Sequence, residues 1–387
     1  MTVQYLLGKL PLATGGLIAM AALSACSSPS APSPLNTDTP ISHRAVGPLP
    51  AITTTPSIAP VQPPAASTPP SAPAPSLPVV SADARQRLIQ ELGAEGLDRA
   101  WVSRQLDQAR YSETVRRLML PPSSPSVRSW PRYRSRFLDA QRINEGAAFA
   151  KRHQPALRRA SEESGVPAEI IVAIIGVETF YGRVTGNFRV IDALSTLAFH
   201  YPPGARSDRS AFFQDQLAAY LRWTHHTRQD PLAIKGSFAG AIGLPQFMPG
   251  SILNWAKDGD QDGKIDLLNS AEDAIASVGE FLKAHGWKAG QPIFVPFDLP
   301  ANAETLVDGG LAPTLSWARL VEAGGRPAQA QAPQGMLGVI DLYDGATHTT
   351  EYRVAADNFF VITQYNRSYF YATAVADLAD AIRRARR

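Results

Sequence analysis

Residues 169 to 182 read Glu-Ile-Ile-Val-Ala-Ile-Ile-Gly-Val-Glu-Thr-Phe-Tyr-Gly, and this stretch decides the fold. Eight apolar or small residues run from Ile170 to Val177 directly into a carboxylate, Glu178, which two aromatic residues and a glycine follow. A segment that is hydrophobic on every face is typical of a helix buried inside a protein. We therefore predict a buried helix here, with Glu178 at its inner end.

The surroundings of Glu178 decide its chemistry. Burial penalises the charged form of a carboxyl group, so the pKa rises and the group can act as an acid near neutral pH. A general acid that protonates a leaving oxygen needs this environment. The alternative is a Glu178 side chain that faces water, as most glutamates do, with no catalytic role.

Helical patterns fill most of the chain around this stretch. Apolar residues recur at helical spacing from residue 81, through 130 to 165, and through 211 to 226. Near the C-terminus the spacing of Tyr371, Val375, Leu378 and Ile382 predicts a helix whose apolar face packs in the core. Residues 290 to 363 differ, because short β-branched or aromatic runs there predict strands around a helix near 315 to 323; the runs are 293–295, 338–340 and 359–363.

The first 80 residues carry export and tether signals. Residues 1 to 25 predict a signal peptide, with Lys9 before an apolar stretch too short for a confident membrane span. The stretch ends in Leu-Ser-Ala-Cys, which resembles the lipobox of bacterial lipoproteins and predicts a lipid on Cys26. No Asp follows Cys26, which favours a lipid-anchored protein of the bacterial cell envelope at the outer membrane, facing the periplasm.

The amino-acid composition narrows the kinds of segment, site and partner that the chain can have. Residues 27 to 80 hold 15 of the chain's 33 prolines, so this segment predicts a disordered linker. Cys26 is the only cysteine, which excludes an internal disulfide and a thiolate metal site. The net charge of +3, without a basic run interleaved with aromatics, argues against nucleic acid as a partner.

A second block, residues 235 to 249, reads Lys-Gly-Ser-Phe-Ala-Gly-Ala-Ile-Gly-Leu-Pro-Gln-Phe-Met-Pro. Its glycines let backbone approach a ligand closely, and Ser237 and Gln246 could bond hydroxyl or acetamido groups. The block lacks the Gly-Lys-Ser/Thr ending of a phosphate-binding loop, which argues against nucleotide binding.

A third block, residues 258 to 266, follows the first part of an EF-hand calcium loop. Oxygen ligands stand at loop positions 1, 3, 5, 7 and 9 and a glycine at position 6; the ligands are Asp258, Asp260, Asp262, the Lys264 carbonyl and Asp266. Position 12 is Asn269 instead of the usual glutamate. The loop predicts a structural Ca²⁺, and the alternative is an acidic, solvated turn.

Together with Glu178-Thr179-Phe180-Tyr181-Gly182 and Tyr365-Asn366-Arg367-Ser368, the glycine-rich block resembles the lytic murein transglycosylase B family, from about residue 81 to the C-terminus. The resemblance implies a mainly α fold of the α+β class: a lysozyme-like core, an N-terminal helical domain and a small strand-containing subdomain. It also implies cleavage of the β-1,4 bond between N-acetylmuramic acid and N-acetylglucosamine in peptidoglycan, leaving a 1,6-anhydro end. The predicted segments are a signal peptide 1–25, a lipidated linker 26–80, a helical domain 81–129, a core 130–290 including the loop 258–273, a β-containing subdomain 291–363 and a C-terminal helix 364–387.

The same resemblance assigns roles to individual residues. Glu178 matches the single catalytic acid/base, and no cofactor is implied for catalysis. The positions that would line the glycan cleft are Ser237, Gln246, Tyr365 and Asn366, to which we add Tyr181 as a wall. The family's calcium loop closes later than an ordinary EF-hand, so Glu272 or Asp273 would complete the ligand set, and we place Asp273 there.

Two other functions stay open from the sequence. A muramidase-type hydrolase of the same bond would need a second carboxylate to position water, and Asp192 is the nearest candidate, although a structural cap or ion pair explains it as well. A non-catalytic peptidoglycan-binding lipoprotein would need only the cleft. The predicted partners are glycan strands and, through Cys26, a membrane; the sequence identifies no protein partner.

Overall fold

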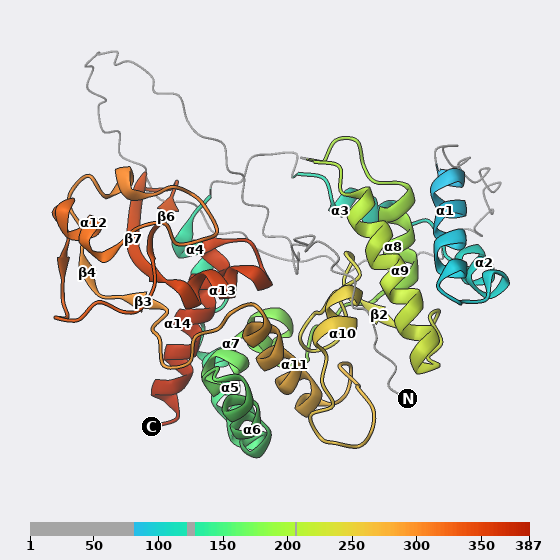
Figure 1. Cartoon of the computed structure of the whole chain (residues 1–387), viewed down its shortest axis with the longest axis horizontal. Helices are drawn as coiled ribbons and strands as arrows, with labels where there is room; N and C mark the ends of the chain where they lie inside the picture. The colour runs from blue at the N-terminus through green and yellow to red at the C-terminus, as the bar shows by residue number, and fades with distance from the viewer. Residues whose placement is uncertain (1–80, 122–127, 206) are drawn as a thin grey trace, which may run out of the picture. The chain divides into compact units, whose positions relative to one another are not determined.

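The computed structural model describes residues 81–121, 128–205 and 207–387 (Figure 1). The predicted signal peptide, Cys26 and linker lie outside these residues. Within the described part, no helix is both long and apolar enough to cross a membrane.

Three short helices open the described chain: α1 (Ser81–Ala94), α2 (Arg99–Asp107) and α3 (Glu113–Leu118). The Asp98 carboxylate accepts hydrogen bonds from the first backbone N–H groups of α2, and Ser112 does the same for α3. α1 packs against α2 and α9, and α3 packs against α8.

The central helices surround α7 (Ala168–Thr179), in which every residue from Ile170 to Thr179 is buried. α7 packs against α14, α5, α11 and α6. The other helices of this part are α4 (Trp130–Ser135), α5 (Ala140–Arg152), α6 (Gln154–Ser164), α8 (Val190–Phe199), α9 (Ser210–Thr227), α10 (Pro249–Trp255) and α11 (Ala271–Ala284). The predicted buried helix is therefore confirmed, and so are the helical patterns through 130 to 165 and 211 to 226.

A small antiparallel sheet with strand order β3-β7-β6 follows. Its strands are β3 (Phe294–Val295), β6 (Leu337–Asp344) and β7 (Thr349–Ala356), and β6 and β7 pair from Leu337 opposite Ala356 to Asp344 opposite Thr349. Alternate residues of β6 point to opposite faces. Leu337 and Val339 enter a small separate core, whereas Ile340 and Leu342 join the main core.

Shorter elements complete this region. They are the pair β4 (Phe297–Asp298) and β5 (Arg326–Pro327), the 3-10 helix η1 (Ala303–Leu306) and α12 (Trp317–Glu322), which confirms the helix predicted near 315 to 323. A separate pair, β1 (Phe188–Arg189) and β2 (Lys235–Gly236), ties the glycine-rich block to the start of α8.

The prediction of a strand at residues 359 to 363 is wrong, because these residues lie in helix α13 (Asp357–Tyr365). A short apolar run cannot by itself distinguish a buried strand from a buried helix. Here the Asn358 side chain bonds the backbone of Lys288 and Gln291, which fixes the start of α13. α13 packs against α14 (Tyr369–Ala385), and α14 in turn contacts both α7 and β6 (Figure 1).

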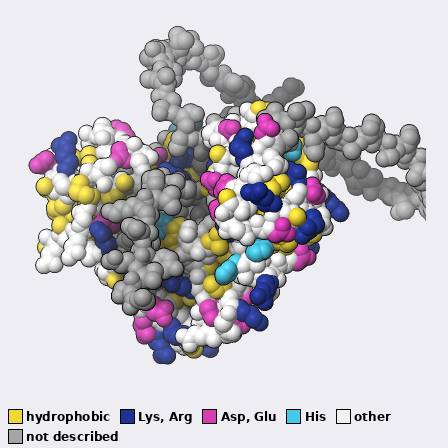
Figure 2. All heavy atoms as spheres, turned by 45° about the vertical axis from the view of Figure 1, so that its right-hand side comes forward, with side chains coloured by type: hydrophobic (Ala, Val, Ile, Leu, Met, Phe, Trp, Pro, Cys, Tyr) yellow, Lys and Arg dark blue, Asp and Glu magenta, His cyan; other side chains and the backbone are white. Residues whose placement is uncertain are grey.

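Basic and acidic side chains are interspersed over the face drawn in Figure 2. Among the described residues visible there, no large field of one sign is seen, which agrees with the small net charge of the chain.

Candidate active site

Glu178 lies at the last turn of α7 and is 3% exposed. The helix ends immediately after it, because Phe180, Tyr181 and Gly182 all adopt the left-handed conformation, with φ of 52°, 58° and 91°. Such a conformation is costly for residues other than glycine and persists only where the surroundings hold it. The backbone is therefore strained directly beside the carboxylate.

Thr179 and Arg142 hold this strained turn in place. The Thr179 hydroxyl donates to the Leu244 carbonyl (2.9 Å) and accepts from Gly182 N–H (3.0 Å). The Arg142 guanidinium donates to the Gly176 carbonyl (2.6 Å) and lies over the Phe180 ring. The end of α7 that carries Glu178 is thus fixed both to the glycine-rich block and to helix α5. Nothing in the sequence around Arg142 marked this role.

Burial raises the pKa of Glu178 to about 8, although a hydrogen bond from Tyr371 opposes the shift. The Tyr371 hydroxyl donates to Glu178 Oε1 over 2.6 Å. At neutral pH Glu178 therefore holds a proton, and Tyr371 is placed to stabilise the carboxylate once that proton leaves.

Sequence reasoning assigned Tyr371 to the core and missed this contact. Tyr371 is indeed buried, on α14, where Ser368 Oγ accepts from its backbone N–H at the start of the helix. Helical spacing identified the buried face of α14 but could not show which group that face meets. The signal for Tyr371 was a phenol in an otherwise apolar stripe, since a buried hydroxyl needs a partner.

The pKa of Glu178 responds to burial and to Tyr371, and no carboxylate of the described chain is among its causes. Asp192 has other partners: it accepts from the Arg110 backbone N–H (2.9 Å) and pairs with Arg189 (3.5 Å). These contacts match the structural role considered for Asp192.

The glycine-rich block reaches α7 through Leu244, and two of its predicted site residues shape its backbone. Ser237 Oγ accepts from the backbone N–H groups of Ala239 (3.3 Å) and Ala241 (3.0 Å). The Gln246 side chain donates to the carbonyls of Thr185 (3.1 Å) and Gly243 (2.9 Å). Both residues are buried. Their predicted contacts with sugar stay predictions.

Tyr365 and Asn366 lie where α13 ends. The Tyr365 hydroxyl donates to the Pro245 carbonyl (2.5 Å), and Glu178 is one of the groups that raise the pKa of Tyr365, after burial. Asn366 is half-buried in the turn before α14. The structure therefore brings the glycine-rich block and the 365–368 motif to the end of α7 that carries Glu178.

Tyr181 is bonded to helix α5 through its hydroxyl. It donates to the Arg142 carbonyl (2.9 Å), and the ring covers Gly146 and Gly176 so closely that a Cβ at Gly176 would lie 2.6 Å from the phenol oxygen. The expected role of Tyr181 as a cleft wall stays a prediction, since these contacts explain the residue by packing.

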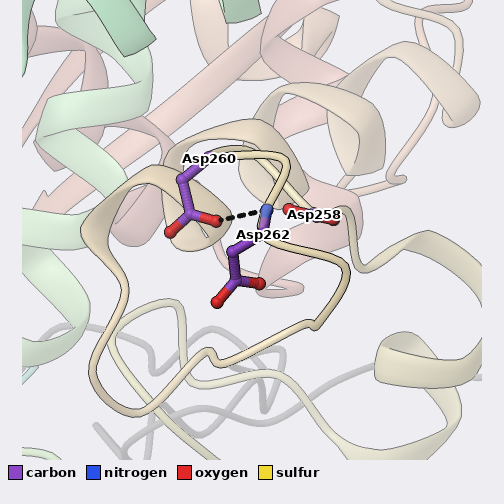
Figure 3. Close-up of side chains that lie close together, drawn as sticks. All are labelled: Asp258, Asp260 and Asp262. Carbon is purple, nitrogen blue, oxygen red and sulfur yellow. Dashed lines mark hydrogen bonds between the residues drawn. The ribbon is translucent and has the colours of Figure 1, made fainter.

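Asp258, Asp260 and Asp262 gather in one loop, with carboxylate oxygens within 4.8 Å of one another (Figure 3). Asp258 accepts from Gln261 N–H (2.6 Å) and Gly263 N–H (2.9 Å), and Gly263 has a φ of 87°. Oxygen ligands this close together suit a hard cation such as Ca²⁺. The loop geometry therefore fits the first part of a calcium site.

The two candidates for closing the loop have other partners. Glu272 pairs with His153 (2.9 Å). Asp273 is 1% exposed and accepts from Gly259 N–H (2.8 Å) and Asp266 N–H (2.6 Å), so it joins the two ends of the loop. Direct ligation by Asp273 stays a prediction.

Comparisons with known proteins show the family to which the chain belongs. Residues 81–380 match the family model described as the transglycosylase SLT domain. The membrane-bound lytic murein transglycosylase B of Escherichia coli (strain K12) is 37% identical over 313 residues, which cover 79% of this chain and 83% of that protein.

Two solved structures show the same fold. The soluble lytic transglycosylase SltB1 from Pseudomonas aeruginosa is 38% identical and superimposes with a TM-score of 0.71 over 79% of this chain and 99% of its own. The Escherichia coli lytic transglycosylase Slt35 in complex with calcium is 38% identical, with a TM-score of 0.69 over 78% and 93% of the two chains. The predicted mainly α, lysozyme-like fold is confirmed. The resemblance seen in the motifs is confirmed too, and the chain belongs to the transglycosylase SLT domain family.

Proposed function

We propose that this protein is a lytic transglycosylase that cleaves the β-1,4 bond between N-acetylmuramic acid and N-acetylglucosamine in peptidoglycan and leaves a 1,6-anhydro end. The observation that carries the proposal is the buried Glu178, whose pKa burial raises to about 8, with a phenol as its polar partner. The family membership supports it, since the curated and solved relatives are lytic transglycosylases.

In the first step Glu178 acts as the general acid. Its pKa of about 8 keeps the proton on the carboxyl group at neutral pH, ready for the glycosidic oxygen. As that oxygen takes the proton and the bond breaks, positive charge develops on the sugar ring and negative charge on Glu178. The Tyr371 hydroxyl stabilises the new carboxylate through its short hydrogen bond.

In the second step the same carboxylate acts as the base. It removes the proton from the C6 hydroxyl of the muramyl residue, whose oxygen closes on C1. Because this nucleophile belongs to the substrate, it is already held near its target, and neither an enzymic nucleophile nor a bound water is required. One carboxylate is then sufficient for the complete reaction.

We propose that Ser237, Gln246, Tyr365, Asn366 and Tyr181 line the cleft in which the glycan strand lies. The hydrogen bonds of Ser237, Gln246 and Tyr365 to backbone fix the shape of the glycine-rich block beside Glu178. A cleft held in this way would meet the strand with preformed backbone groups, which avoids an ordering cost on binding.

A hydrolase would be built differently. Glycosidases that use water or an enzymic nucleophile place two carboxylates about 5 to 9.5 Å apart. Among the described residues, the influences on Glu178 include no carboxylate, and Asp192 is engaged elsewhere. The muramidase alternative is therefore not favoured.

Mass spectrometry of digested peptidoglycan tests the proposal. The wild-type protein should release muropeptides with 1,6-anhydro ends, and the Glu178→Gln variant should release none. The substitution Glu162→Gln, on the exposed face of α6, is the matched control. Reducing ends produced by the wild type, or unchanged release by the Glu178 variant, would contradict the assignment.

The acidic loop supports a second, structural part of the proposal. Asp258, Asp260, Asp262 and the Lys264 carbonyl would hold a calcium ion, with Asp273 at the junction of the loop ends. Slt35 has been solved in complex with calcium, which supports the same ion here. Calcium would neutralise the repulsion between the aspartates and stabilise the loop.

The relative from Escherichia coli is a membrane-bound transglycosylase, and we infer from this that the chain is a protein of the cell envelope. We propose further that a lipid on Cys26 anchors it in the outer membrane, facing the periplasm, with residues 27 to 80 as the tether. The small residues before Cys26 and the serines after it support this placement.

A further inference from the structure

Three tyrosine side chains lie close enough to Glu178 to respond to its charge. Two of them, Tyr371 and Tyr365, belong to the candidate active site, and the third is Tyr133 on helix α4. Burial raises the pKa of each phenol, and the Glu178 carboxylate raises it further. Because a charge acts only weakly over long distances in a screened medium, all three phenols lie near the carboxylate.

Two of these three hydroxyl groups are engaged within the protein. Tyr371 donates to Glu178 Oε1 (2.6 Å). Tyr365 donates to the Pro245 carbonyl (2.5 Å). The Tyr133 hydroxyl, in contrast, forms no hydrogen bond with a residue that the structure describes, and its oxygen is not fully buried. Among the three phenols, Tyr133 therefore keeps a donor that a substrate can use.

The ring of Tyr133 is held in place by aromatic neighbours. Its centroid lies 5.2 Å from that of Phe137, 5.6 Å from that of Phe370 and 6.4 Å from that of Trp130. Phe370 directly precedes Tyr371 in α14, so this packing also sets the position of one phenol relative to the other. A hydroxyl on a ring that is already fixed loses little freedom when it binds a ligand.

Packing explains the ring of Tyr133 but not its hydroxyl. Phenylalanine would make the same three ring contacts. The residue is only 9% exposed, and a polar group that is largely withdrawn from water without a hydrogen-bond partner costs stability. The hydroxyl is therefore best explained by a partner from outside the chain, and the substrate that reacts at Glu178 is the group that comes close to it.

The second step of the proposed reaction needs a group that orients the C6 hydroxyl of the muramyl residue. The hydrogen of this hydroxyl has to point at the Glu178 carboxylate while its oxygen faces C1. Since Tyr371 bonds Oε1 of Glu178, Oε2 is the oxygen that is left to exchange protons with the substrate. A donor on the far side of the C6 oxygen would fix this orientation, and correct orientation of a nucleophile contributes strongly to its rate of attack.

We propose that the Tyr133 hydroxyl donates a hydrogen bond to the C6 oxygen of the muramyl residue and aims that oxygen at C1. The inference rests on the proposed function, because only closure of the 1,6-anhydro ring uses this oxygen. The C6 proton passes to Glu178 and the C6 oxygen bonds C1, while the electron pair of the broken bond stays with the leaving oxygen, which has taken the first proton of Glu178. Tyr133 keeps its own proton and favours the sugar's hydroxyl over water as the nucleophile.

Tyr133→Phe removes the hydroxyl and keeps the ring contacts. Tyr352→Phe, on strand β7, is the matched control, because the Tyr352 hydroxyl also has no described hydrogen-bond partner and its ring packs against the small separate core. Both variants should unfold at the temperature of the wild type, since neither loses a hydrogen bond within the described chain. A melting temperature that falls for Tyr133→Phe alone would give the hydroxyl a structural role and would overturn the inference.

The first measurement identifies the muramyl ends that each protein makes from peptidoglycan in water enriched in oxygen-18. The wild type and the control should make anhydro ends at equal rates. For Tyr133→Phe, kcat should fall about tenfold and the ratio of labelled reducing ends to anhydro ends should rise about tenfold, as expected for the loss of one orienting hydrogen bond. The same ratio in Tyr133→Phe and the wild type, at whatever rate, would overturn the inference. Reducing ends as the main product of the wild type would instead refute the proposed function.

The second measurement does not depend on cleavage and uses the Glu178→Gln background. The probes are a tetrasaccharide of alternating N-acetylglucosamine and N-acetylmuramic acid and its analogue with hydrogen in place of the C6 hydroxyl of the muramyl residues. Isothermal titration should show a preference for the first probe, and this preference should be about fivefold smaller when Tyr133→Phe is added. An equal preference in both proteins, or none in either, refutes the contact even in a protein whose wild type makes anhydro ends.

Discussion

Replacing Glu178 by Gln should abolish cleavage and at the same time make the fold more stable. The folded protein raises the pKa of Glu178 from the ordinary value of 4.5 to about 8, chiefly through burial. Between these two pH values the unfolded chain ionises Glu178 while the folded chain must keep it protonated. The contribution of Glu178 to stability is therefore fully present below pH 4.5 and is lost as the pH rises to about 8.

The magnitude follows from the size of the pKa difference. Each pH unit in this window costs about 1.4 kcal/mol, so the wild type loses about 3 kcal/mol by pH 7 and about 5 kcal/mol above pH 8. Glutamine is neutral at every pH, has nearly the same shape and can still accept the Tyr371 hydrogen bond. The variant should therefore escape the loss, and its melting temperature at pH 7 should be about 5 °C above that of the wild type.

Chemical denaturation at a series of pH values between 4 and 8.5 checks the expectation. The free energy of unfolding of the two proteins should coincide near pH 4 and separate steadily above it, with the variant higher. For Glu162→Gln, which removes an exposed glutamate, the free energy of unfolding should equal that of the wild type at every pH. If the free energy of unfolding of the Glu178 variant also equals that of the wild type up to pH 8, Glu178 is not a buried neutral acid and the reasoning fails.

Three further predictions address Tyr371, the acidic loop and the anchor. Tyr371→Phe removes the bond that favours the Glu178 carboxylate, so the alkaline limb of the kcat/KM profile should move up by about 1 to 2 pH units while the maximal rate falls; an unmoved limb would exclude the pairing. Calcium at about 100 times its Kd should stabilise the wild type by about 2.7 kcal/mol, and Asp260→Asn should lose this gain in thermal unfolding; equal gains would place the ion elsewhere. Cys26→Ala should move the protein from the membrane to the soluble fraction, and continued sedimentation with membranes would argue against lipidation.

The sequence was sufficient for the part of the site that local pattern encodes. The apolar run before Glu178 predicted a buried helix and a carboxyl group with a raised pKa, and both are present in the structure. The aspartates at alternate positions of the 258–266 loop likewise predicted a cluster of oxygen ligands. In each case a few neighbouring residues determine the outcome, so no long-range packing has to be known.

Contacts between distant segments could not be predicted in this way. Tyr371 lies 193 residues from Glu178, and its helical spacing showed burial without showing its partner. The pattern of the run 359–363 alone is compatible with a strand and with a helix. The contacts of Asn358 and the packing on α14 select the helix. Arg134 likewise pairs with Asp377, 243 residues away, and no motif connects the two residues.

The central claim is that one carboxylate, without water, carries the whole reaction. Digestion of purified peptidoglycan in water enriched in oxygen-18, followed by mass spectrometry of the new muramyl ends, tests it most directly. The mechanism predicts anhydro ends that contain no heavy oxygen and weigh one water less than reducing ends. Reducing ends that carry one oxygen-18 atom at C1 would show that water is the nucleophile and would contradict the role given to Glu178.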